Sequence, residues 1–92
     1  MDYSLKQDGF ELLVEAEKER VKEEVLSSYI NLRKKKGITQ QQIADRTGMQ
    51  RTNIVRIESG RYSPSIEVLV KLAAALDMDI EIRLVERKSG DE

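Results

Sequence analysis

The sequence predicts an all-α protein with one β-strand near its C-terminal end. Residues 10–36 contain neither Gly nor Pro and consist mostly of good helix formers. Three shorter helical patterns follow, and only residues 80–85 alternate apolar and polar side chains as a strand does. With 92 residues, the chain is expected to fold as one small domain with a modest core.

A long helix, or two helices in direct succession, is expected over residues 10–36. Apolar side chains recur there at helical spacing, but the run "EAEKER" at residues 15–20 interrupts them. We therefore expect a break, a frayed turn or a solvated crossing at that point. The piece before it has too little apolar surface to fold alone, so it must dock on the domain, on a second copy or on a partner.

Two short helices with a tight turn between them are expected next. Thr39 is a predicted N-cap for a helix at residues 40–47, which ends at Gly48, and a second short helix follows at residues 51–58. This arrangement fits a helix-turn-helix motif, whose second helix lies in the major groove of DNA. The side chains expected to pack inward are Ile43, Ala44, Met49, Ile54 and Ile57.

The last helix and the strand complete the predicted fold. A helix start at Pro64 and Ser65 leads to an apolar pattern in which Ile66, Leu69, Val70, Leu72, Ala73 and Leu76 are expected to face the core. A lone strand has unpaired N–H and C=O groups, so its simplest partner is the same strand of a second copy. We expect dimerisation through Ile80, Ile82 and Leu84.

Charge is strongly segregated, although the formal net charge is only −1. Residues 1–30 sum to −4, residues 31–62 to +6 and residues 63–92 to −3. A basic middle between acidic ends indicates either a patch for a polyanion or a locally basic solvated face.

On the predicted second short helix the outward side chains are Gln50, Arg51, Thr52, Asn53, Val55 and Arg56, which are types that suit reading of DNA bases.

The composition argues against catalysis. The chain has no cysteine and no histidine, which removes thiol nucleophiles, disulfides, structural zinc sites and an imidazole base. Neighbouring carboxylates such as Glu23 and Glu24 do not converge on a helix, so we expect no enzymatic activity, no metal and no cofactor. The first residues lack the features of a signal peptide and no run is long enough to span a membrane, so a cytoplasmic protein without membrane contact is expected.

Residues 32–78 resemble the helix-turn-helix domain of the Cro and phage-repressor (XRE) class. The elements "LRKxxGxTQxxIAxxTG", "IxRIExG" and "PSxxxLxKLAxAL" stand in that family's order, spacing and register. The resemblance implies a five-helix, lambda-repressor-like domain in which residues 40–47 support a recognition helix at residues 51–58. It also implies a homodimer that binds an inverted-repeat operator of double-stranded DNA as a transcriptional repressor.

The resemblance assigns roles residue by residue. Gln40 would bond a phosphate and brace the recognition helix, and Arg33 and Glu58 would form a partly buried salt bridge. The base-reading positions are Arg51, Thr52 and Arg56, with Asn53 near a phosphate or base edge, Val55 on the same face, and Arg61 and Tyr62 at the DNA backbone. Gln50 departs from the Ser, Thr or Asn that usually caps this helix and would reach a phosphate instead. Arg46 is expected to be a surface residue or a contact to the DNA backbone.

The two ends of the chain define the remaining alternatives. We divide the chain into a helical extension at residues 1–20, a DNA-binding domain at residues 21–78, and a dimerisation strand with a disordered tail at residues 79–92. The ends resemble antitoxins of the HigA and HipB types, so the protein is expected to be either a free-standing repressor or the antitoxin and autorepressor of a toxin–antitoxin operon. The alternative from another class is a protein-interaction module that sequesters a toxin without needing DNA.

Overall fold

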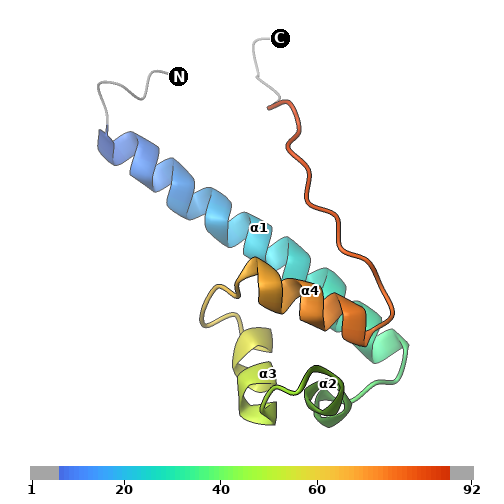
Figure 1. Ribbon diagram of the computed structural model, residues 1–92. Coiled ribbons are helices and arrows are strands. Elements are labelled where there is room, and N and C mark those ends of the chain that lie inside the picture. Colours follow the sequence, from blue (N-terminus) through green and yellow to red (C-terminus); the bar gives the residue numbers. More distant parts are fainter. Residues whose placement is uncertain (1–6, 88–92) are drawn as a thin grey trace.

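The computed structural model describes residues 7–87; the start of the expected N-terminal extension and the end of the expected tail lie outside them. This part of the chain contains four helices and no strand (Figure 1). The helices are α1 (Gln7–Lys35), α2 (Gln40–Thr47), α3 (Arg51–Glu58) and α4 (Ile66–Ala75). The predicted all-α class is confirmed, and α2 and α3 have the bounds that were predicted from the sequence.

The break expected near residues 15–20 is absent, because α1 is one continuous helix. Residues 7–87 hold four helices and not the five that the family resemblance implied. Ion pairs one turn apart cross the interrupted region: Lys18 with Glu15 at 3.0 Å, and Arg20 with Glu17 at 2.9 Å. Charged pairs thus sustain the helix where the apolar stripe stops. The N-terminal half of α1 projects beyond the other helices (Figure 1).

The core lies between α2, α3, α4 and the C-terminal half of α1. Its buried apolar side chains are Leu26, Tyr29, Ile43, Ala44, Ile54, Ile57, Leu72, Ala75 and Leu76. In α4, however, Ile66 and Val70 are 63% and 46% exposed, contrary to expectation. The core stripe of α4 runs through Val68, Leu72 and Ala75 instead, at spacings of four and three, and leaves Ile66 and Val70 on the outer side of the helix.

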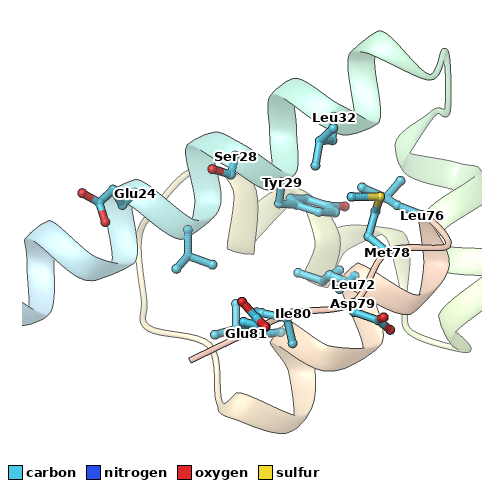
Figure 2. A pocket seen from close by; sticks show the side chains of 13 residues that line it. Glu24, Ser28, Tyr29, Leu32, Leu72, Leu76, Met78, Asp79, Ile80 and Glu81 are labelled. Atoms are coloured by element: carbon cyan, nitrogen blue, oxygen red, sulfur yellow. The ribbon is translucent and has the colours of Figure 1, made fainter. Parts of the chain in front are cut away.

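After α4 the chain turns back along α1 as an irregular segment (Figure 1). The expected strand does not form, because residues 7–87 offer no second strand for it to pair with. Ile80 is half-buried, whereas Ile82 is 61% exposed and Leu84 fully exposed. Met78 and Ile80 help to line a cavity of about 420 Å³ between α1 and α4, into which Tyr29 also faces (Figure 2).

Candidate nucleic-acid interface

The turn between α2 and α3 is fixed by local hydrogen bonds. At the start of α2, the Gln42 N–H donates to Thr39 Oγ1 at 3.0 Å, and the Thr39 N–H donates to Gln42 Oε1 at 2.8 Å. At its end, Gly48 has a φ of +77°, which favours glycine, and its N–H donates to the Ala44 carbonyl at 2.9 Å. The Met49 N–H then donates to Thr47 Oγ1 at 3.1 Å. These bonds set the direction in which α3 leaves the turn.

A buried network holds the C-terminal end of α3 to α1 and α2. Arg33 Nε and Nη2 donate to the two carboxylate oxygens of Glu58, both at 2.8 Å, and Arg33 is only 8% exposed. Gln40 Nε2, from the start of α2, donates to Glu58 Oε1 at 3.2 Å. Burial and the Glu58 charge raise the pKa of the nearby Tyr29 hydroxyl, which therefore stays neutral. The structure thus places Arg33, Glu58 and Gln40 together, as a brace for α3.

The side chains expected to read DNA lie on α3 and its two flanks. Arg51, Thr52, Val55 and Arg56 are exposed and Asn53 is half-buried. Gln50 is the N-cap of α3 but makes no side-chain capping bond. In the loop after α3, Arg61 and Tyr62 are both exposed. The outer face of α3 is therefore accessible along its whole length.

The arginines of this surface have no counter-ion. Within residues 7–87, no hydrogen bond or ion pair engages the guanidinium group of Arg51, Arg56 or Arg61. The two carboxylates of residues 31–62 bond other groups: Glu58 is held by Arg33 and Gln40, and Asp45 accepts from Gln41 at 2.9 Å. The positive charge of the segment is thus left uncompensated at the surface.

An open depression of about 650 Å³ adjoins this surface, between the end of α1, the start of α2 and α3. Lys34, Gln40, Gln41, Arg51 and Val55 are among the residues that line it. The cations Lys34 and Arg51 line this hollow beside the first turn of α2, and the Glu58 carboxylate in its wall is held by Arg33. This arrangement suits an anion.

Two further cations have roles that sequence reasoning missed. Lys22 Nζ donates to the Gly60 carbonyl at 3.1 Å and ties the loop after α3 to α1. Arg46 is exposed, as expected, but its guanidinium group is engaged within the chain, because its Nη1 donates to the Ala75 carbonyl at 2.8 Å and satisfies the C-terminal end of α4. No signal in the sequence marks either contact, since both acceptors are backbone atoms distant along the chain.

Other kinds of site find no support in this part of the protein. Among residues 7–87, no group of three or more Asp, Glu, His or Cys side chains lies close enough to hold a metal ion. Over the same residues, none of the helices combines the length and the apolar character needed to cross a membrane.

Comparison with known proteins gives consistent relatives. Over 44 residues the chain is 46% identical to an uncharacterized HTH-type transcriptional regulator of Methanothermobacter thermautotrophicus, covering 48% of this chain and 64% of that protein. It is 37% identical over 65 residues to the ImmF control region 10 kDa protein of Bacillus phage phi105, covering 64% of this chain and 72% of the relative. It is also 42% identical over 62 residues to the cryptic phage CTXphi transcriptional repressor RstR of Vibrio cholerae, covering 67% of this chain and 54% of the relative.

The chain therefore spans less than two thirds of the first and third of these relatives. No solved structure matches it. The helix-turn-helix family model matches residues 30–82, which include the C-terminal part of α1, all of α2, α3 and α4, and the start of the segment after α4. Because this match spans more than half of the sequence, the chain belongs to the helix-turn-helix family.

Proposed function

We propose that the protein is a sequence-specific DNA-binding transcriptional repressor. The observation that carries the proposal is the set of exposed arginines, Arg51, Arg56 and Arg61, that lack counter-ions on and beside α3. Unpaired guanidinium groups on an exposed helix after a tight turn suit DNA, whose backbone is a dense line of negative charge. Two of the relatives, the repressor RstR and the phi105 control-region protein, also support a role in transcriptional repression.

The side chains divide into base readers and phosphate contacts. Arg51 and Arg56 would bond guanine edges, while the methyl groups of Thr52 and Val55 would contact thymine methyls. Asn53 is half-buried, so it would reach only a nearby phosphate or base edge. The depression beside α2 would receive a phosphate against Gln40 and Lys34, with Gln50, Arg61 and Tyr62 as further backbone contacts.

A homodimer would present two copies of α3 to an inverted-repeat operator with half-sites about one helical turn apart. The exposed residues Ile82 and Leu84, with Ile80, support pairing of this segment with its counterpart in a second copy. In a paired strand their apolar side chains would be covered and their backbone groups bonded.

The antitoxin variant rests on the resemblance of the chain ends alone, and the relatives described above do not carry a toxin–antitoxin name. The repressor is therefore the function that we propose. The following experiment distinguishes this repressor from the alternative function, sequestration of a toxin without DNA.

The test is binding of the purified protein to DNA from the promoter of its own gene, measured by fluorescence anisotropy across a salt series. Affinity should fall steeply with salt, because each neutralised phosphate releases counter-ions. Arg51→Ala should lower discrimination against a wrong base pair by about 1–3 kcal/mol, whereas Arg61→Ala should weaken all sequences alike and reduce the salt slope by about 1.

Lys71→Ala is the matched control, since Lys71 is an exposed cation on α4 that is paired with Glu67 at 3.6 Å. It should leave affinity and salt slope unchanged. If the protein binds no fragment of that promoter at low salt, the repressor proposal fails and the interaction module becomes the better explanation.

A further inference from the structure

The N-terminal half of α1 carries an apolar stripe that the rest of the chain leaves half-exposed. Phe10, Val14 and Val21 are each 46–47% exposed, and Val25 is partly buried. At 100° per residue these four positions fall within an arc of about 60° on the helix surface. Past Val25, the same side of α1 is covered by α4 and by Met78–Ile80 (Figure 2). The stripe is therefore a half-exposed continuation of a buried surface.

The stripe also forms the wall of a groove. Val14, Val21 and Val25 line one side of an apolar hollow of about 440 Å³, and Pro64 and Leu69 line the other. The outer apolar residues of α4, Ile66 and Val70, are exposed as well. A straight apolar stripe beside such a groove is the shape that another helix would fill.

The order of residues in the stripe indicates which helix that is. Phe10 and Val25 lie equally far from the midpoint between Glu17 and Lys18, and so do Val14 and Val21. When two copies of α1 lie antiparallel about a two-fold axis at that midpoint, Phe10 faces the Val25 position of the second copy, and Val14 faces its Val21 position. A stripe with this symmetry is complementary to itself.

Charges at the midpoint do not oppose such contact, because each is already paired within its own helix. Glu17 bonds Arg20 at 2.9 Å and Lys18 bonds Glu15 at 3.0 Å. The hydrogen bond from Arg20 lowers the pKa of the Glu17 carboxyl, with a smaller contribution from the charge of Arg87.

We infer that α1 is a self-association surface, on which the N-terminal half of α1 packs antiparallel against that of a second copy of this chain. The paired stretch from Phe10 to Val25 is about 24 Å long, which is four helical turns on each copy. Stable interfaces bury about 800 Å² on each partner, so this contact needs the outer face of α4 and residues 80–84 to complete it. The inference deepens the dimer of the proposed function and rests on it, because it adds the N-terminal half of α1 to the residues 80–84 proposed there.

The first test is self-association of the full chain without DNA, measured by sedimentation. The double variant Val14→Glu, Val21→Glu places carboxylates opposite each other and should weaken dimerisation on the order of 100-fold. Glu is a better helix former than Val, so the isolated fold should keep its helicity. Mixing it with the Val14→Lys, Val21→Lys variant should restore a dimer, because Glu and Lys then face each other. Leu12→Glu is the control, since Leu12 is 71% exposed on the opposite side of α1.

Disulfide cross-linking tests the antiparallel register, and the absence of natural cysteines makes introduced ones unique. Val14→Cys chains mixed with Val21→Cys chains should cross-link under mild oxidation, whereas either variant alone should not. In the antiparallel pairing, identical positions of the two copies are offset by about 10 Å along the helix, which is too far for a disulfide between them. Cross-linking of Val14→Cys with itself would overturn the antiparallel pairing.

Self-association that is unchanged by the Val14→Glu, Val21→Glu variant would overturn the inference altogether, and would assign α1 to a different partner. This outcome is distinct from failure of the proposed function. A protein that cross-links as described but binds no DNA would keep the α1 pairing and refute the repressor, while a DNA-binding protein without the cross-link would do the reverse.

Discussion

At the scale of single residues, Glu58 is the point where three helices meet. It accepts from Arg33 of α1 and from Gln40 of α2, while it belongs to α3 itself. A buried carboxylate is costly unless its oxygens are bonded, and here three N–H groups bond them. The same contacts withdraw the acidic side chain from the surface that the arginines of α3 occupy.

Glu58→Gln should therefore destabilise the fold by about 3–5 kcal/mol, because it leaves the guanidinium of Arg33 buried without its counter-charge. The measurement is urea unfolding followed by circular dichroism. Glu67→Gln is the matched control: Glu67 pairs with Lys71 at 3.6 Å with 79% of its side chain exposed, and its change should stay within about 0.5 kcal/mol. Equal effects in the two variants would show that the buried pair does not hold α3 in place.

At the scale of elements, α2 and α3 begin differently. α2 has a complete capping box at Thr39, whereas the N-cap of α3, Gln50, is extended but makes no side-chain bond. The free N–H groups at the start of α3 are thus left for solvent or for a ligand. This difference suits a helix whose N-terminal end approaches DNA phosphates.

Gln50→Ser should stabilise the protein by about 0.5–1 kcal/mol by supplying the missing cap, while Thr39→Ala should destabilise it by about 1 kcal/mol. Thermal unfolding measures both. If Gln50 contacts a phosphate, as we propose, the same Gln50→Ser variant should bind the operator more weakly although it is more stable. A variant that gains stability without losing affinity would remove Gln50 from the interface.

The elements also show which features the sequence could predict. The bounds of α2 followed from Thr39 and Gly48, whose effects are local, and those of α3 from Ser59, Gly60 and the family resemblance. The continuity of α1 did not follow, because ion pairs such as Lys18–Glu15 replace the apolar periodicity where it stops. Lys22 and Arg46 were missed because their acceptors, the Gly60 and Ala75 carbonyls, lie 38 and 29 residues away. The strand at residues 80–85 depends on a partner that one chain does not supply.

At the scale of the whole molecule, α1 spans the protein from the stripe to the brace. The molecule measures 48 × 25 × 18 Å along its principal axes, and its longest dimension reflects this one long helix. The end with Val14 lies beyond the domain, while the end with Arg33 is bonded to α3. The direction of the stripe relative to α3 is therefore set by the helical repeat of α1.

One alanine inserted between Val25 and Leu26 should turn the whole stripe, from Phe10 to Val25, by about 100° relative to α3. The core begins after the insertion, so folding should persist, and binding to a single half-site should be unchanged. Binding to the full inverted repeat should weaken, because the two copies of α3 no longer face one side of the DNA. Seven inserted residues, close to two full turns, should restore the direction. Anisotropy on half-site and full-site DNA measures this, and equal binding by both insertion variants would contradict it.

The two attachments of α1 to the end of α3 and the loop after it have a mechanical consequence. Lys22 holds the Gly60 carbonyl and Arg33 holds Glu58, at points about 16 Å apart along one unbroken helix. Two contacts at separate points oppose rotation of α1 relative to α3, so each copy should move as one rigid body. In the proposed dimer, tolerance of operators with unequal half-site spacing would therefore depend on the contact between the two copies, and that contact would decide the range of DNA sites bound.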